Sequence, residues 1–179
     1  MKRLIWLGLG SNMGNRLDHL KQAVDFVISH PEMKLQKCSR VYETEYVGPG
    51  NQDAFLNACV EIQSGLPLLD LLGEFQMLER RLGRQSHGHM KPRPLDVDFL
   101  LVDDVEMIDT RLEVPHPRLV ERLFVLIPLA DIAPDKIIPN SGETVASRCA
   151  KIKRKSGPAV TVRQDLVLQS GKPDAIMED

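Results

Sequence analysis

The chain has 179 residues, a formal net charge of −2 and 42% hydrophobic residues, which fits one ordinary domain and excludes a largely disordered chain. It carries no domain-wide basic stripe, so nucleic acid is not an expected partner. No apolar run approaches the roughly 20 residues that span a bilayer, and the apolar N-terminal run ends at Gly10 without a cleavage site. The cysteines are three and far apart, which predicts isolated thiols in a cytoplasmic protein.

The first part of the chain predicts a strand, a helix and two further strands. Residues 3–9 form a short apolar run bounded by glycine, which is typical of a strand. Apolar residues over 17–28 then repeat at helical spacing, and this helix should end before Pro31. Residues 35–42 and 55–62 are the next two expected strands, with a long loop between them.

A second helix and a fourth strand follow. Pro67 suits the first turn of a helix, and Gly83 is a plausible C-terminal stop for its leucine-rich stripe. After the polar loop 84–94, residues 95–102 predict a strand that is apolar on both faces beyond Asp98, so we expect it to be central. This order of elements predicts an α+β fold, a ferredoxin-like α/β sandwich with a mainly antiparallel sheet.

The remainder of the chain gives weaker signals. A hairpin turn is expected at 103–104, leading into residues 105–108, and a short helix around 118–122 precedes a segment punctuated by prolines. The last residues contain Gly and Pro and lack a helical stripe. We therefore expect a single domain over 1–160 and a C-terminal tail over 161–179.

The sharpest chemical signal is the sequence Arg93-Pro94-Leu95-Asp96-Val97-Asp98. Alternate residues of a strand point the same way, so Asp96 and Asp98 should share one face, about 7 Å apart. Two such carboxylates repel each other unless a cation lies between them. Mg²⁺ is often held by one or two carboxylates plus substrate phosphates. Two such ions can clamp a phosphoryl-transfer site. The alternative is a solvated strand edge, although the apolar run that follows favours the metal site.

Cationic side chains flank this pair. Arg84 and Arg93 border the polar loop, Lys91 lies within it, and Arg118 and Arg122 are one helical turn apart. Planar guanidinium groups suit phosphate contacts, which a phosphoryl-transfer site needs for charge neutralisation. The alternative is a set of exposed surface arginines. For Arg93, the short spacing to the aspartates favours the phosphate role.

Other polar residues leave two interpretations open. His116, fixed between two prolines, could bond a nucleotide or act as an acid, but it could equally pack a turn. Leu72, Gln76 and Glu79 share one stripe of the second helix. They could contact a base or a phosphate-bound metal, yet by themselves Gln76 and Glu79 are better explained as the solvated edge of the core stripe. Asn12 and Asn15 are expected to shape a turn and cap the first helix.

Taken together, these motifs are more specific than any one of them. In chain order they are GLGSNMGNR at 8–16, Tyr42-Glu43-Thr44 with Gly48, Phe55-Leu56-Asn57-Ala58, Gln76-x-x-Glu79 with Gly83-Arg84, Pro92 to Asp98, and Val114-Pro115-His116-Pro117 with Arg122 and Phe124. Over roughly 3–140 the chain resembles the 6-hydroxymethyl-7,8-dihydropterin pyrophosphokinases of folate biosynthesis. This resemblance implies a ferredoxin-like fold and transfer of the β,γ-diphosphate of ATP to a pterin alcohol, with AMP as the leaving group.

The resemblance also implies a role for each matching position. Asp96 and Asp98 would ligate two Mg²⁺ ions, and Arg84 and Arg93 would clamp the phosphates, with Arg122 assisting. The pterin would be read at its polar edge by Asn57 and stacked between two phenylalanines. The implied ATP pocket is Leu72, Gln76, Glu79, Phe99, Arg111, His116 and Arg122, and the implied pterin slot is Gly10, Thr44, Val47, Phe55, Asn57 and Phe124.

Departures from the family pattern affect the substrate loops rather than the aspartates. Met90 and Lys91 stand where the family often has an aromatic residue and a glycine, and Pro117 replaces an aromatic of some members. The loops 43–54 and 84–94 are expected to close over the substrates. The expected partners are the pterin and ATP, with the chain acting as a monomer. The rival functions are a kinase that transfers a single phosphoryl group and a non-catalytic ATP-binding regulatory module.

Overall fold

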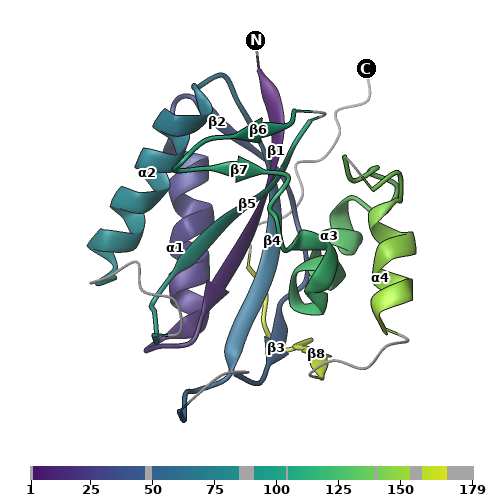
Figure 1. The fold of residues 1–179 in the computed structure, drawn as a ribbon. Helices are drawn as coiled ribbons and strands as arrows, with labels where there is room; N and C mark the ends of the chain where they lie inside the picture. The colour runs from purple at the N-terminus through teal and green to yellow at the C-terminus, as the bar shows by residue number, and fades with distance from the viewer. Residues whose placement is uncertain are drawn as a thin grey trace, which may run out of the picture.

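A computed structural model of the chain describes residues 2–46, 50–84, 91–103, 105–139, 141–153 and 159–168. One β-sheet lies between two layers of helices (Figure 1). Helices α1 and α2 cover one face of the sheet, and α3 and α4 lie on the other face. Within the described ranges, no helix has the length and apolar character that crossing a membrane requires. The helices are α1 (Arg16–Ser29), α2 (Leu68–Arg81), α3 (Leu123–Ile132) and α4 (Val145–Lys153).

The sheet is antiparallel at every pairing between its described strands. Its order is β5-β1-β4-β3-β8, and β2 also pairs with β4. The first 102 residues therefore follow the predicted order of strands and helices, and the predicted α+β class is confirmed. The strands are β1 (Arg3–Ser11), β2 (Met33–Cys38), β3 (Tyr42–Thr44), β4 (Phe55–Ser64), β5 (Asp96–Val102) and β8 (Val160–Val162).

The predicted strand over 35–42 is two strands in the structure. Both β2 and β3 pair with β4, but the chain bends between them at Ser39. The backbone N–H of Ser39 donates to the Cys59 carbonyl at 2.8 Å, and the Ser39 hydroxyl oxygen accepts from the Cys59 N–H at 2.8 Å. A side chain thus takes over one ladder hydrogen bond, which lets the strand break without leaving a buried backbone group unpaired.

Two hydrophobic cores fix the sheet between its helix layers. On the α1 and α2 side, the ring of Phe75 meets Phe26 at 5.6 Å and Phe99 at 6.0 Å, edge to face in both cases. On the α3 side, Leu126 and Leu129 are completely buried against the sheet. Burial on both faces makes the sheet a rigid platform, so the positions of groups at the ends of β1, β4 and β5 are fixed by packing.

Strand β5 is an edge strand, so the predicted central position is wrong. It pairs only with β1 among the described strands, and its outer edge is covered in other ways. The His116 N–H donates to the Leu100 carbonyl at 2.9 Å, and the Val97 N–H donates to the Glu79 carboxylate at 2.8 Å. An apolar run indicates that both faces of a strand are buried. It does not indicate whether another strand or a loop lies beside the edge of that strand.

The chain after β5 also differs from its prediction. Strand β6 (Met107–Ile108) pairs with β7 (Glu113–Val114) instead of forming a hairpin with β5. The helix expected around 118–122 is a single 3₁₀ turn, η1 (Leu119–Glu121), and the proline-punctuated segment contains α3 and α4. Pro128 lies inside α3 and is buried there, so burial of this helix outweighs the backbone hydrogen bond that proline removes.

Part of the expected C-terminal tail belongs to the folded domain. Strand β8 pairs with β3, so the expected boundary between residues 160 and 161 falls inside a strand. Arg163 Nη1 lies 2.9 Å from Glu43 Oε2, and Leu168 is 5% exposed. Residues 169–179 lie outside the described residues. Cys38, Cys59 and Cys149 are free cysteines in the fold.

We expect a chain that ends at residue 159 to unfold more readily than the full chain. It loses the β8 ladder and the buried Leu168 side chain, which should lower the free energy of unfolding by about 2 kcal/mol or more. Urea unfolding followed by circular dichroism measures this difference. A chain that ends at Leu168 keeps every contact described above and is the matched control. Equal stability of the two shortened chains would contradict the assignment of β8 to the domain.

Candidate active site

The two aspartates open β5 at one end of the sheet. Asp96 is opposite Gly10 of β1 and Asp98 is opposite Gly8, so small residues lie beside both carboxylates. Val97 points to the core, whereas the Asp96 and Asp98 side chains are 24% and 35% exposed. Strand alternation therefore sets both carboxylates on one accessible face, as the sequence pattern indicates.

Two arginines hold Asp96 from different elements. Arg84 Nη1 lies 2.6 Å from Asp96 Oδ1, and Arg93 Nη1 lies 2.9 Å from Asp96 Oδ2. Gly83, with φ of 98°, ends α2 in the left-handed conformation that a glycine adopts readily, and this turn delivers Arg84. A third arginine, Arg122, approaches Asp98 Oδ2 at 4.0 Å. The structure thus brings together Arg84, Arg93, Arg122 and both aspartates.

Glu79 is buried, so the solvated edge position expected from its stripe is wrong. It is 4% exposed, and its Oε1 accepts from Arg84 Nη1 at 2.6 Å and from the Val97 N–H at 2.8 Å. Burial raises the pKa of Glu79 to about 7, against the opposing effects of the Arg84 charge and the Val97 hydrogen bond. This carboxylate joins the end of α2 to the outer edge of β5.

The local electrostatics favour binding of further charged groups. Burial, and then the Asp96 charge, raises the pKa of Asp98 to about 6 despite Arg122, Arg93 and Arg84. Arg84 also has a buried Nε atom that meets no hydrogen-bond acceptor in the described part of the chain. A buried unpaired donor is costly, so it points to an acceptor that arrives with a ligand, such as a phosphate oxygen.

The donor set fits magnesium better than a metal held entirely by protein. Among the described residues, no three His, Cys, Asp or Glu side chains are grouped as a metal site. Asp96 and Asp98 supply two carboxylates on one face, and Mg²⁺ is commonly held by one or two carboxylates together with substrate phosphates and water. The residues present therefore fit Mg²⁺ that arrives with a phosphate ligand.

His116 packs a turn, which is one of the two interpretations left open by the sequence. Its N–H covers the edge of β5 at Leu100, and its Nδ1 accepts from the Arg118 N–H at 3.1 Å, which packs the turn. Burial and the charges of Arg122 and Arg118 lower the pKa of His116 to about 4. A neutral imidazole at physiological pH can bond a nucleotide but does not act there as an acid. The Arg118 side chain is 64% exposed, and its Nε lies 3.9 Å from Glu121 Oε2.

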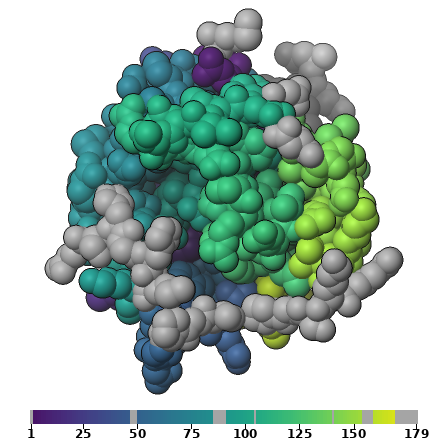
Figure 2. All heavy atoms as spheres, viewed as in Figure 1, coloured from purple at the N-terminus to yellow at the C-terminus, as the bar shows by residue number. Residues whose placement is uncertain are grey.

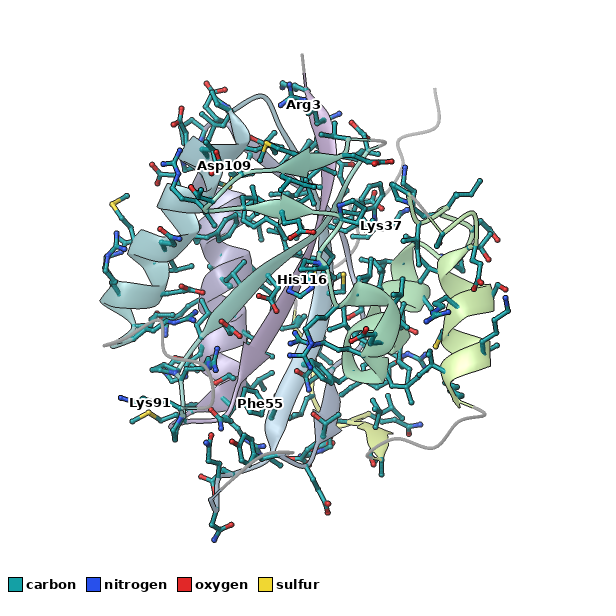
Figure 3. All side chains as sticks on the ribbon, viewed as in Figure 1. Arg3, Lys37, Phe55, Lys91, Asp109 and His116 are labelled. Atoms are coloured by element: carbon teal, nitrogen blue, oxygen red, sulfur yellow. The ribbon has the colours of Figure 1, made fainter. Side chains whose placement is uncertain are left out.

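The predicted pterin residues meet at the same end of the sheet. Gly10 is opposite Asn57 in β4 and Asp96 in β5, so it adjoins both parts of the site. Buried Asn57 donates from Nδ2 to the Thr44 hydroxyl at 2.8 Å. A Cβ atom added to Gly10 would lie 3.6 Å from Asn57 Oδ1, 3.7 Å from Phe55 Cδ1 and 3.9 Å from Asp96 Cβ. Figure 3 shows Phe55 and Lys91 at this lower end of the sheet.

For the remaining predicted residues, the structure gives less direct evidence of a position in the site. Phe124 is half-buried, with the Arg122 guanidinium carbon 5.6 Å from its ring centroid, and Val47 lies outside the described residues. Phe99 is 3% exposed in the core, so the structure does not present it as a binding surface. Arg111 is 64% exposed and pairs at 3.6 Å with Asp109, which Figure 3 places at the opposite end of the sheet from Phe55. Leu72 and Gln76 are half-buried on α2.

The surface is hollowed between α2 and the segment that follows β6. Figure 2 shows a recess between the teal surface of α2 and the green surface of the segment that follows β6. The expected nucleotide residues Gln76 and His116 come from these two segments.

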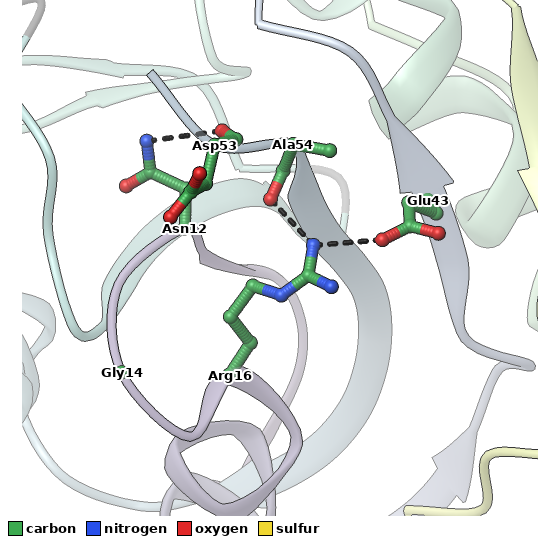
Figure 4. A pocket seen from close by; sticks show the side chains of 6 residues that line it. All are labelled: Asn12, Gly14, Arg16, Glu43, Asp53 and Ala54. Atoms are coloured by element: carbon green, nitrogen blue, oxygen red, sulfur yellow. Dashed lines mark hydrogen bonds and ion pairs between the residues drawn. The ribbon is translucent and has the colours of Figure 1, made fainter.

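Sequence reasoning missed Asn12 as a member of the site. Asn15 caps α1 as expected, with its Oδ1 accepting from the Asp18 N–H at 3.2 Å, but Asn12 bonds to the loops on either side. A cavity of about 210 Å³ adjoins it, where Arg16 Nη1 contacts Glu43 Oε1 at 2.8 Å and the Ala54 carbonyl at 2.6 Å (Figure 4). The only local signal was its position two residues after Gly10 at the end of a strand.

Comparisons with known proteins show which family the chain resembles. The family described as 7,8-dihydro-6-hydroxymethylpterin-pyrophosphokinase (HPPK) matches residues 6–134. The 2-amino-4-hydroxy-6-hydroxymethyldihydropteridine pyrophosphokinase of Bacillus subtilis is 40% identical over 158 residues, 88% of this chain and 95% of the relative. The protein of the same name from Methylorubrum extorquens is 40% identical over 147 residues, 82% of this chain and 92% of the relative. A Plasmodium falciparum HPPK-DHPS structure shares the fold, with a TM-score of 0.66 at 15% identity over 84% of this chain, which spans 44% of that longer one.

The pH dependence of folding should depend on Glu79. Because burial raises its pKa from 4.5 to about 7, the folded state binds more protons than the unfolded state between these values, and stability falls as pH rises through them. The Glu79→Gln variant keeps an acceptor oxygen but lacks this titration. From about pH 5 to about pH 7, wild type should therefore lose about 2 kcal/mol relative to the variant.

Urea unfolding at several pH values measures this change. Asp25→Asn, a substitution of an exposed carboxylate on α1, is the matched control and should parallel wild type. The same pH dependence in the Glu79→Gln variant and in wild type would contradict the raised pKa of Glu79.

Proposed function

The chain belongs to the 7,8-dihydro-6-hydroxymethylpterin-pyrophosphokinase family, and we propose that the arginines and aspartates at the start of β5 form its diphosphate-transfer centre. The reaction transfers the β,γ-diphosphate of ATP to 6-hydroxymethyl-7,8-dihydropterin, in folate biosynthesis. The pterin hydroxymethyl oxygen forms a bond to the β-phosphorus while the bond to the α-phosphate oxygen breaks, and AMP leaves. The names of the relatives do not support a non-catalytic ATP-binding module.

One observation carries the assignment of the centre. Both carboxylate oxygens of Asp96 are engaged by guanidinium groups, from Arg84 at 2.6 Å and Arg93 at 2.9 Å. Arg93 lies three residues before Asp96, but Arg84 lies twelve residues before it and reaches it from the end of α2. Arginines that neutralise a carboxylate can turn to phosphate oxygens when a cation takes that carboxylate.

Asp96 and Asp98 are the proposed ligands of two Mg²⁺ ions that bind with ATP. When bound, the ions would neutralise phosphate charge and polarise the phosphate that is attacked. The raised pKa of Asp98 supports this role, because a carboxylate whose charge is disfavoured in the free protein gains most from a neighbouring cation. Gly8 and Gly10 in the adjacent strand carry no side chain to block the approach.

Arg84, Arg93 and Arg122 are the proposed clamp on the transferred diphosphate. Transfer of this group depends on orientation and on stabilising charge more than on a strong base. The unpaired Nε of Arg84 supplies a donor that is already desolvated, so a phosphate oxygen there would satisfy it. Glu79 would act indirectly, since its bond to Arg84 Nη1 fixes the plane in which that guanidinium lies.

The substrates would lie on the two sides of this clamp. ATP would occupy the recess beside α2, with Gln76 and His116 as polar contacts and Leu72 as an apolar one. The pterin would occupy the slot beside Gly10, with Asn57 at its polar edge and Phe55 and Phe124 at its faces. Because Gly10 adjoins both Asn57 and Asp96, this placement brings the pterin alcohol close to the metal ligands. The roles of Val47, Phe99 and Arg111 stay predictions from the resemblance.

Product analysis tests the reaction and its aspartates together. With ATP, Mg²⁺ and 6-hydroxymethyl-7,8-dihydropterin, the wild type should form AMP and a pterin diphosphate, separable by chromatography. Asp96→Asn should lower kcat by at least about 100-fold, because a metal ligand is lost. The matched control, Asp25→Asn on the solvent face of α1, should retain full activity. Release of ADP instead of AMP, or full activity of Asp96→Asn, would contradict the proposal.

A substitution at Gly10 tests the position of the pterin slot. In Gly10→Ala the added methyl meets Asn57, Phe55 and Asp96 at 3.6–3.9 Å, ordinary contact distances, so the fold should persist. The methyl occupies space that the pterin needs, and KM for the pterin should rise about tenfold while KM for ATP changes little. Gly73→Ala on α2, where a Cβ meets nothing within 4 Å, is the control. An unchanged pterin KM would place the slot elsewhere.

A further inference from the structure

Asn12 holds the backbone of Arg93 in place. The Asn12 N–H donates to the Arg93 carbonyl at 3.2 Å, and the Arg93 N–H donates to Asn12 Oδ1 at 2.8 Å. These two hydrogen bonds fix both backbone groups of the residue whose guanidinium binds Asp96. Asn12 is 2% exposed, so water does not compete readily for these bonds.

The other end of the same side chain binds the segment that leads into β4. Asn12 Nδ2 donates to Gln52 Oε1 at 3.0 Å and to the Asp53 carbonyl at 3.5 Å. A backbone N–H can only donate, so the amide oxygen must face Arg93 and the amide nitrogen must face Gln52. Aspartate lacks that donor and alanine lacks both groups, so neither keeps the whole bridge.

This bridge links the two halves of the site. Gln52 and Asp53 directly precede Phe55 and Asn57 of the proposed pterin slot, whereas Arg93 belongs to the proposed phosphate clamp. The segment before β4 has a second anchor, because Arg16 binds the Ala54 carbonyl (Figure 4). Loss of the Asn12 side chain would therefore remove the hydrogen bonds that connect this segment to Arg93, while Arg16 would still bind the segment.

We propose that Asn12 is a positioning residue. It couples the position of Arg93 at the diphosphate to the segment that borders the pterin slot. The inference rests on the proposed function of the site and adds a link between its two substrates. Its consequence is that the contact between Gln52 and Asn12 influences the transfer step through Arg93. A small displacement of a charged group at a transfer site can lower the rate by as much as about 100-fold.

A double-mutant cycle on the full chain tests this link. Asn12→Ala should lower kcat about tenfold or more, because Arg93 loses the acceptor of its N–H. Gln52→Ala should lower kcat less and raise KM for the pterin. If Gln52 acts through Asn12, the double variant should be no slower than Asn12→Ala alone, instead of showing the product of both losses. Asn15→Ala, in the same turn but bonded only to the start of α1, should keep wild-type kcat and KM.

A conservative substitution keeps the test valid if the buried Asn12→Ala variant does not fold. Gln52→Glu still accepts from Asn12 Nδ2 and should retain kcat, while Gln52→Ala should not. Equal kcat for Gln52→Glu, Gln52→Ala and wild type would overturn the link, as would multiplicative losses in the double variant. Failure of the proposed function is distinguishable, because in that case wild type itself forms no AMP from ATP and the pterin.

Discussion

The buried carboxylate of Glu79 is the contact on which the site depends. Its Oε1 accepts from Arg84, at the end of α2, and from the Val97 N–H, between the two aspartates of β5. A helix and an exposed strand edge are thereby fixed to each other by one charged group. Removing one partner from a buried ion pair leaves the other charge uncompensated, which is more costly than the pair is stabilising. The positions of Arg84 and Asp98 therefore depend on Glu79.

Charge balance explains how such a cluster exists without ligands. Asp96 is neutralised by Arg84 and Arg93, while Asp98 has a raised pKa and lies 4.0 Å from Arg122. The charge of Asp98 is thus less fully compensated than the charge of Asp96. In the proposed function, a phosphate ligand with its cations would supply acceptors for the arginines and positive charge for the aspartates at the same time, so the binding of ATP would favour that of Mg²⁺.

Sequence patterns predicted what is local and missed what is tertiary. The strand and helix order to residue 102 follows from periodicity, and the aspartates with Arg93 were found because they lie within six residues. Contacts between distant segments determine the edge position of β5, the burial of Glu79 and the pairing of β8 with the sheet. Arg163 reaches Glu43 across 120 positions, and no window of sequence contains both.

The end of β1 shows why the role of a short motif is not apparent from its residues alone. GLGSN at 8–12 follows a strand and resembles part of a phosphate-binding glycine loop, but it lacks the third glycine and the βαβ context of one. In the fold, β1 lies between β4 and β5, so its last residues meet the ends of both neighbours. Gly10 leaves open the space between Asn57 and Asp96, and Asn12 bonds Gln52 on one side and Arg93 on the other. The motif thus serves the site through its position between two strands, a property that becomes visible only when the order of the sheet is known.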